Sequence, residues 1–124
     1  MRVRSLILFV DDDESTRFAA NGLLTDEGYD VVLASDGREA LAVFASARPA
    51  LVLTDIQMPA SNELLSSLGE ISPSTPVVLL TAHNPIDAQR LAHRFGAAGF
   101  INKPLDLDRL LALVSSITER AFDT

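Results

Sequence analysis

Acidic side chains and one lysine are the residues of this sequence best suited to do chemistry. Asp11, Asp12 and Asp13 stand in a run directly after an apolar segment, and Asp55 closely follows another. Lys103 is the only lysine in the chain. Aspartate titrates near ~3.9, so a cluster of aspartates repels itself at neutral pH and needs a cation. Mg²⁺ suits this cluster because it prefers oxygen ligands and often takes one or two carboxylates together with a phosphate.

Phosphoryl transfer is the reaction that these residues could support. A carboxylate such as Asp55 can attack phosphorus and form an aspartyl phosphate. The transfer needs in-line positioning and positive charge around the phosphoryl oxygens, which a metal ion and one lysine supply. Taken singly, an acidic run is usually a solvated surface feature. The position of these residues after apolar segments favours the functional interpretation.

Short apolar segments alternate with segments of helical period along the chain. The apolar segments are typical of strands buried on both faces, and they cover residues 6–10, 31–34, 50–53, 76–80 and 100–101. The helical segments cover residues 14–27, 36–47, 63–71, 84–95 and the residues from 106 onward. Asp36 and the pair Asn84-Pro85 are typical helix starts, and Gly96 is a typical helix end. Alternating strands and helices predict an α/β fold with a doubly wound parallel sheet.

Composition narrows the classes of function. The chain of 124 residues has no cysteine, which excludes disulfides and thiolate metal sites and fits a reducing compartment. Its formal net charge of -7 argues against direct binding to nucleic acid, which needs clustered lysine and arginine. No segment approaches the ~20 apolar residues of a membrane helix, and the first apolar run is too short for a signal peptide. We therefore expect a cytoplasmic domain with no membrane partner.

The motifs at the predicted strand ends resemble those of a known family. They are Val10-Asp11-Asp12-Asp13, Thr54-Asp55-Ile56-Gln57-Met58-Pro59, Leu80-Thr81-Ala82 and Lys103-Pro104. In this order and spacing they resemble the receiver domain of bacterial two-component response regulators. The resemblance covers nearly the whole chain and implies a single receiver domain over residues 1–124. It also implies a flavodoxin-like fold of five parallel strands in the order 2-1-3-4-5, flanked by five helices.

The resemblance implies a phosphoacceptor and a metal site. Asp55 would accept a phosphoryl group from the phosphohistidine of a sensor histidine kinase or a histidine phosphotransfer protein. Asp12 and Asp55 would bind Mg²⁺ directly, Asp11 would act mainly through water, and the backbone carbonyl of Gln57 would be the third protein ligand. Lys103 would pair with Asp55 and then with the phosphoryl group. The domain would catalyse its own phosphorylation and dephosphorylation without being a metabolic enzyme.

The resemblance also implies a switch. Thr81 would hydrogen-bond a phosphoryl oxygen and move, and Phe100 stands at the position of the aromatic ring that rotates inward with it. Gln57 and His83 stand at two positions that tune the dephosphorylation rate. The Lys103-Pro104 bond would be cis, a form that only X-Pro bonds adopt at low cost. The signal would pass to a downstream protein or to an output domain of a longer regulator.

One segment departs from the family pattern. After Pro59 the chain continues Ala60-Ser61-Asn62-Glu63, a shorter connection without the glycines that the family usually has there. Glycine adopts backbone angles that other residues avoid, so this connection favours an alternative, a receiver-fold interaction module that signals without phosphorylation. A flavin or nucleotide binder would need a phosphate-binding loop where the chain has its acidic run. A haloacid-dehalogenase-type phosphatase would need a second aspartate where Gln57 stands.

Overall fold

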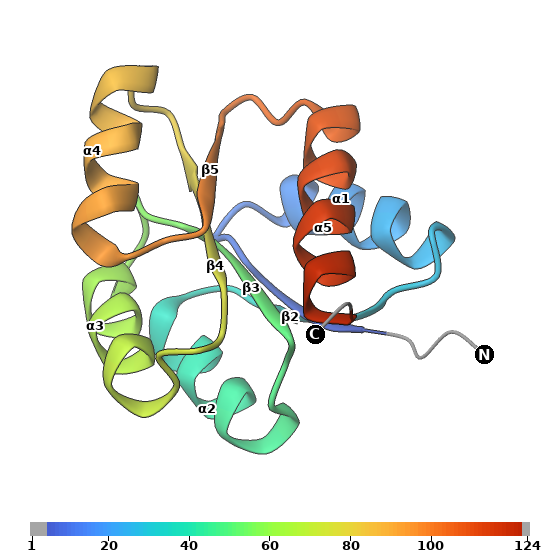
Figure 1. Cartoon of the computed structure of the whole chain (residues 1–124), viewed down its shortest axis with the longest axis horizontal. Helices are drawn as coiled ribbons and strands as arrows, with labels where there is room; N and C mark the ends of the chain where they lie inside the picture. The colour runs from blue at the N-terminus through green and yellow to red at the C-terminus, as the bar shows by residue number, and fades with distance from the viewer. Residues whose placement is uncertain (1–4, 123–124) are drawn as a thin grey trace.

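The computed structural model describes residues 5–122, which form a parallel sheet with helices on both faces (Figure 1). Strands and helices alternate as β1 Leu6–Val10, α1 Glu14–Asp26, β2 Asp30–Ala34, α2 Gly37–Ala47, β3 Leu51–Asp55, α3 Ser61–Ile71, β4 Val77–Thr81, α4 Pro85–Phe95, β5 Gly99–Asn102 and α5 Leu107–Phe122. The strand order is β2-β1-β3-β4-β5, and all neighbouring pairs are parallel. The predicted α/β fold, doubly wound in the order 2-1-3-4-5, is confirmed.

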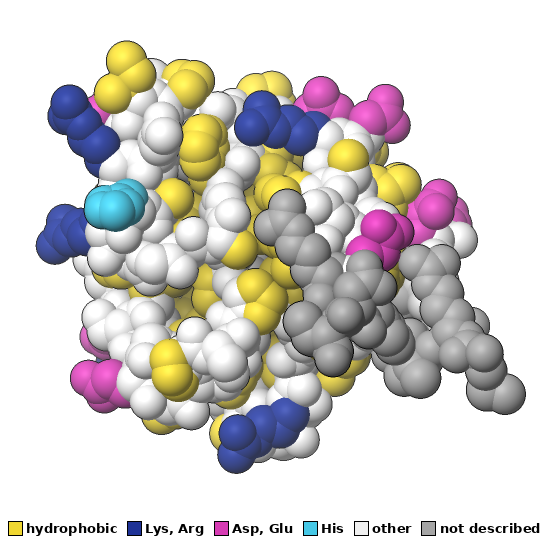
Figure 2. Space-filling view, in the orientation of Figure 1, with side chains coloured by type: hydrophobic (Ala, Val, Ile, Leu, Met, Phe, Trp, Pro, Cys, Tyr) yellow, Lys and Arg dark blue, Asp and Glu magenta, His cyan; other side chains and the backbone are white. Residues whose placement is uncertain are grey.

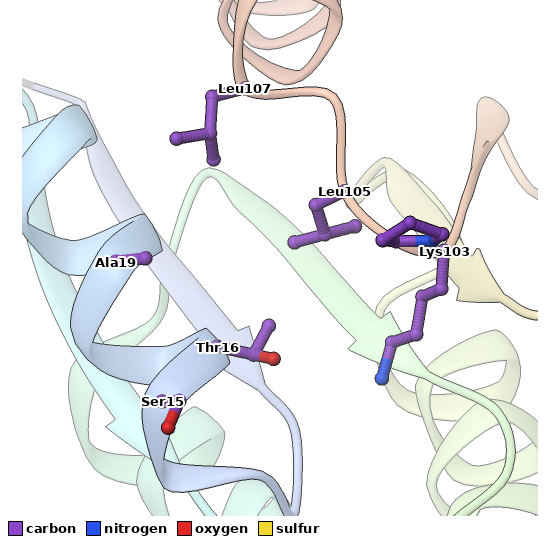
Figure 3. A pocket seen from close by; sticks show the side chains of 7 residues that line it. Ser15, Thr16, Ala19, Lys103, Leu105 and Leu107 are labelled. Atoms are coloured by element: carbon purple, nitrogen blue, oxygen red, sulfur yellow. The ribbon is translucent and has the colours of Figure 1, made fainter.

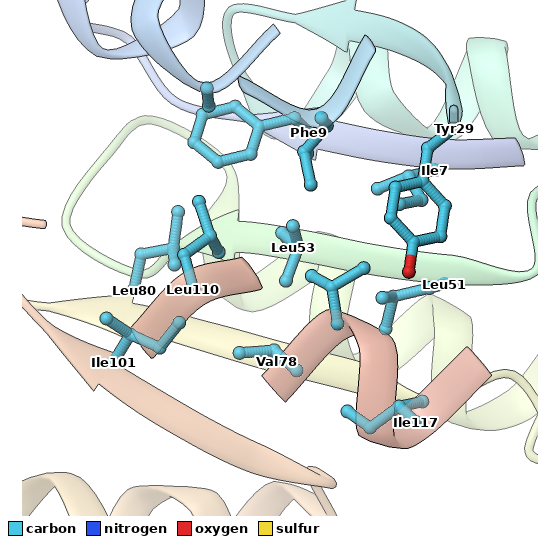
Figure 4. Close-up of a cluster of buried hydrophobic side chains, with 13 residues drawn as sticks. Ile7, Phe9, Tyr29, Leu51, Leu53, Val78, Leu80, Ile101, Leu110 and Ile117 are labelled. Carbon is cyan, nitrogen blue, oxygen red and sulfur yellow. The ribbon is translucent and has the colours of Figure 1, made fainter. Parts of the chain in front are cut away.

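One face of the sheet packs against α1 and α5. Ile7 and Phe9 of β1 meet Leu24 of α1 and Leu110 and Val114 of α5 in one buried cluster (Figure 4). Successive residues of a strand point to opposite faces, so alternate positions of each strand enter this cluster. Helix α5 buries Leu110, Val114 and Ile117, which recur at helical spacing on one side of the helix.

The other face is covered by α2, α3 and α4. Leu8 and Val10 pack with Phe44 of α2 and Leu64 of α3, and a third cluster joins Leu79 of β4 to α3 and α4. Because both faces are covered, the central strands need apolar residues at consecutive positions. Strand β3 is buried at every position, including its two polar residues at the carboxyl end.

Several helix termini lie where the local sequence predicted them. Asp36 caps α2 by accepting a hydrogen bond from the backbone N–H of Glu39 at 2.8 Å. Asn84 caps α4 in the same way, and Pro85 is the first helical residue. Gly96 ends α4 with a φ of 67°. These caps satisfy backbone groups that have no partner within their own helix.

Other details differ from the sequence-based expectation. Within the helical segment predicted at residues 14–27, the large apolar side chain of Phe18 is 81% exposed, and Ala20 and Leu24 are the residues that α1 buries. Ile71 and Ile86 are also exposed. Helix α3 begins at Ser61 rather than residue 63, and β3 and β4 each extend to the polar residue that was expected to follow them.

Charge is distributed unevenly over the surface. Figure 2 shows basic side chains and a histidine at the left over α4, and acidic side chains at the right over α1 and α5. The exposed basic residues near the end of α4 are Arg90, His93 and Arg94. Within residues 5–122, none of the helices combines the length and the apolar character needed to cross a membrane.

Candidate functional site

The carboxyl ends of four strands bring the predicted site residues to one edge of the sheet. The parallel register pairs Val10 with Thr54 and Thr81 with Asn102. The next residues along β1, β3 and β5 therefore emerge side by side, at the edge where ligands of doubly wound sheets bind. The side chains gathered there are those of Asp11, Asp12, Asp55, Thr81 and Lys103.

The ammonium group of Lys103 bridges two buried carboxylates. Its Nζ lies 2.7 Å from Oδ2 of Asp11 and donates a hydrogen bond to Oδ2 of Asp55 at 3.0 Å. The lysine side chain is 21% exposed, whereas those of the two aspartates are 0% and 3% exposed. Burial by itself lowers the pKa of Lys103, but the contacts with Asp11 and Asp55 outweigh it and raise the pKa above 10.5. Lys103 is therefore charged at neutral pH.

Asp11 is held through its side chain and through its backbone carbonyl. Its Oδ1 accepts a hydrogen bond from the N–H of Asp13 at 2.9 Å, and its carbonyl accepts one from Nη1 of Arg17 at 2.6 Å. Its Oδ2 lies 2.7 Å from the ammonium group of Lys103, which is its one polar partner within residues 5–122. Burial raises the pKa of Asp11 above 3.8, against the lowering effect of Lys103. Arg17 was not predicted to join the site; its position one turn into the helix after the acidic run was the available signal.

The three carboxylates fit a hard divalent cation. Asp11, Asp12 and Asp55 each offer an oxygen, and these oxygens lie within 4.8 Å of one another. Asp12 is exposed while the other two are buried, so one side of the cluster faces solvent. An all-oxygen donor set suits Mg²⁺.

Asp11→Asn is expected to stabilise the metal-free protein at neutral pH and to weaken Mg²⁺ binding about tenfold. Because burial raises the pKa of Asp11 in the folded chain, its charged form costs stability above that pKa, and the cost disappears as the pH falls below 3.8. Chemical denaturation in a chelator at several pH values measures the stability, and a Mg²⁺ titration without chelator measures the affinity. The gain over the wild type should be positive at neutral pH and vanish in acid.

Asp26→Asn, which changes an exposed acid at the end of α1, is the control for this substitution. It should leave the unfolding free energy and the Mg²⁺ affinity close to those of the wild type. A lower unfolding free energy for Asp11→Asn than for the wild type, at neutral pH in chelator, would contradict the cost assigned to the buried charge.

The segment after Asp55 folds back over its carboxylate. Oδ1 of Asp55 accepts a hydrogen bond from the backbone N–H of Gln57 at 2.9 Å, while Oδ2 faces Lys103. Oε1 of Gln57 accepts a hydrogen bond from the N–H of Ala82 at 3.2 Å. Both carboxylate oxygens of Asp55 are thus oriented, and Gln57 links the segments that follow β3 and β4.

Thr81 lies buried at the end of β4, beside the lysine. Its Oγ1 accepts a hydrogen bond from the N–H of His83 at 3.0 Å, and its carbonyl accepts one from the N–H of Lys103 at 2.8 Å. The carbonyl of His83, whose side chain is exposed, accepts a hydrogen bond from Nδ2 of Asn102 at 2.6 Å. The Lys103-Pro104 bond is cis, as predicted. Asn102 was not predicted to take part, although its place directly before Lys103 pointed to this edge.

Phe100 does not lie among the carboxylates. It is half-buried against the third core cluster, with Leu79 of β4 and Ala92 of α4. Its neighbour Ile101 enters the cluster on the opposite face of the sheet, as strand alternation requires. The guanidinium of Arg109 lies 6.0 Å from the centroid of the Phe100 ring.

A pocket of about 270 Å³ opens beside Lys103, between α1 and the connection from β5 to α5 (Figure 3). Thr16 and Ala19 of α1 line one side, and Leu105 and Leu107 line the other. The walls of the pocket are mainly apolar. Figure 3 shows that the amine of Lys103 lies near the end of β3.

The protein is an α/β domain with a doubly wound sheet. Its acidic site, with one lysine, lies at the carboxyl edge of that sheet. Residues 7–115 match the response regulator receiver domain, and the chain belongs to that family. The identification made from the motifs is therefore confirmed.

Individual relatives agree with this assignment. The chain is 36% identical over 113 residues to the DNA-binding transcriptional regulator NtrC of Salmonella typhimurium, covering 90% of this chain and 24% of NtrC. It is 39% identical over 122 residues to the nitrogen assimilation regulatory protein NtrX of Azorhizobium caulinodans, covering 95% of this chain and 26% of NtrX. The chain thus spans about a quarter of the length of these relatives. The structure of the chemotaxis response regulator CheY4 of Vibrio cholerae has a TM-score of 0.86 and 31% identity, covering 93% of this chain and 99% of CheY4.

Proposed function

We propose that the chain is a phosphorylation-activated signalling switch that accepts a phosphoryl group on Asp55. The observation that carries this proposal is the position of the Lys103 ammonium, 2.7 Å from Asp11 and 3.0 Å from Asp55, beside the exposed Asp12. A nucleophilic carboxylate, a fixed positive charge and a set of oxygen ligands are thereby combined at one edge of the sheet. Membership of the receiver family supports the same function.

The phosphoryl donor is the phosphohistidine of a sensor histidine kinase or of a histidine phosphotransfer protein. A carboxylate oxygen of Asp55 forms a bond to phosphorus while the bond from phosphorus to the histidine nitrogen breaks, and that nitrogen keeps the electron pair. Lys103 offsets negative charge on the phosphoryl oxygens, and the N–H of Gln57 keeps the carboxylate in place. The pocket beside Lys103 gives the donor side chain room to approach.

The carboxylates would hold Mg²⁺ during the transfer. Asp12 and Asp55 would be the direct ligands, Asp11 would act mainly through water, and the backbone carbonyl of Gln57 would be the third protein ligand. When bound, Mg²⁺ offsets the repulsion between the carboxylates and the incoming phosphoryl oxygens. The carboxylate oxygens of Asp11, Asp12 and Asp55, which lie within 4.8 Å of one another, support this assignment.

The switch uses Thr81 and Phe100. The Thr81 hydroxyl turns from its contact with the N–H of His83 toward a phosphoryl oxygen, and the half-buried Phe100 ring turns inward as Thr81 moves. Gln57 and His83 tune the dephosphorylation rate. The side chain of Gln57 accepts a hydrogen bond from the N–H of Ala82, the residue that follows Thr81. The changed surface is read by a downstream protein or by an output domain in the same polypeptide.

Labelling with a small phosphodonor tests the proposal. The chain is incubated with acetyl phosphate and Mg²⁺, and its intact mass is measured beside that of a control receiver domain. We expect the mass of one added phosphoryl group, and no addition when EDTA removes the metal. An unmodified chain beside a labelled control would contradict the proposal and favour a receiver-fold module that signals without phosphorylation.

A further inference from the structure

The connection from β3 to α3 is held firmly at its beginning. The N–H of Ile56 donates to the carbonyl of Leu80 at 3.2 Å, and Oγ of Ser61 donates to the carbonyl of Ile56 at 2.8 Å. Between these contacts, the N–H of Gln57 donates to Oδ1 of Asp55 at 2.9 Å. The course of this short connection therefore determines how the Asp55 carboxylate is oriented.

The other end of the connection rests on Gly37, the first residue of α2. The N–H of Gly37 donates to the carbonyl of Pro59 at 3.1 Å. Gly37 is buried, and a Cβ atom at this position would overlap the carbonyl group of Ala60. Because the obstacle is backbone, no side-chain rotation relieves the overlap. Only glycine lets α2 begin so close to the connection.

Ala60 carries the backbone conformation that glycine usually supplies. Its φ of 63° and ψ of 19° lie in the left-handed region, which residues with a Cβ rarely adopt. No glycine is present between Ile56 and Ala60. A residue stays in such a conformation only when its surroundings stabilise it. The close contact between Ala60 and Gly37 is part of those surroundings.

We propose that Gly37 is a positioning residue for the site. Through Pro59 and Ala60 it determines the path of the connection, and thereby the position of the Gln57 main chain that orients Asp55. Gly37 itself touches neither the carboxylates nor the lysine. The inference rests on the proposed function only for the chemistry that Asp55 performs once it is oriented.

Gly37→Ala tests this role, with Gly69→Ala as the matched control. Both changes add one methyl group within a helix, but a Cβ at Gly69 meets no atom within 4 Å. In Gly37→Ala we expect amide hydrogen exchange at Gln57 and Ser61 to become at least about tenfold faster, because local opening becomes easier. We also expect Mg²⁺ to bind about tenfold more weakly, as when other residues behind metal ligands are changed. Gly69→Ala should match the wild type in both measurements.

If the new methyl group unfolds Gly37→Ala, a double variant can still test the role of Gly37. Gly37→Ala combined with Ala60→Gly gives the connection freedom to move away from the methyl group. This protein should unfold near the wild-type temperature while exchange at Gln57 stays fast. Wild-type exchange at Gln57 in either folded variant overturns the role of Gly37. Absence of Mg²⁺ binding by the wild type would instead contradict the proposed function, and the exchange rates would still decide the role of Gly37.

Discussion

Asp55→Asn is expected to abolish the phosphoryl adduct that acetyl phosphate and Mg²⁺ form on the wild-type chain. An amide is not a nucleophile toward phosphorus under these conditions, so the acceptor is lost. Asparagine has nearly the same size, and its side-chain oxygen can still accept the hydrogen bond from Gln57 that is 2.9 Å long in the wild type. Lys103 keeps its contact with Asp11 at 2.7 Å, so the variant should fold. Intact mass after matched incubation is the measurement.

A second aspartate provides the control for this experiment. Asp26→Asn removes the same charge from an exposed position at the end of α1 and should be labelled like the wild type. Equal labelling of Asp55→Asn and the wild type would show that another residue is the acceptor, and peptide mapping would then identify it. Far-ultraviolet circular dichroism of both variants ensures that loss of labelling is not loss of folding.

Lys103→Met is expected to lower the unfolding free energy in chelator by about 2–3 kcal/mol, somewhat less than the ~3–5 kcal/mol typical of breaking a fully buried ion pair. The substitution leaves the carboxylates of Asp11 and Asp55 buried without the ammonium that now contacts both. The expected loss of unfolding free energy is smaller than for a fully buried pair because the lysine side chain is 21% exposed in the wild type. Adding Mg²⁺ should recover part of the loss, since a bound cation again offsets the carboxylates.

The loss of unfolding free energy in Lys103→Met should become smaller at high pH. Contacts with the carboxylates raise the pKa of Lys103 above 10.5, so its stabilising effect is fully present below pH 10.5 and is lost as the pH rises through the raised pKa. The difference between the wild type and Lys103→Met should therefore be constant near neutral pH and shrink in strong alkali. Denaturation curves across this range measure it.

Two further substitutions separate charge from position. Arg90→Met removes an exposed cation from α4 and should change the unfolding free energy little. Lys103→Arg keeps the charge, but a planar guanidinium cannot replace a compact ammonium between two carboxylates, so we expect Lys103→Arg to impair switching. An unfolding free energy of Lys103→Met equal to that of the wild type in chelator would contradict the structural importance of this lysine.

The amino-acid sequence by itself determined the elements of the fold and the charged residues of the candidate site. Caps such as Asp36 and Asn84 were predictable because a side-chain oxygen reaches a backbone N–H only three residues away. Apolar strands followed by carboxylates indicated a parallel sheet with its site at the carboxyl edge. The strand order was predicted through the family resemblance, because local patterns do not say which strands are neighbours.

Only the tertiary structure decided which of these residues meet. Sequence spacing does not show that Lys103 lies even nearer to Asp11 than to Asp55, nor that Phe18 is exposed while Ala20 is buried. The approach of Gly37 to Ala60 is equally invisible in the sequence, since the two belong to different elements. Such contacts join residues far apart along the chain, and the packing of helices on the whole sheet sets them. Local preferences determine where an element begins and ends, whereas the neighbours of each side chain depend on that packing.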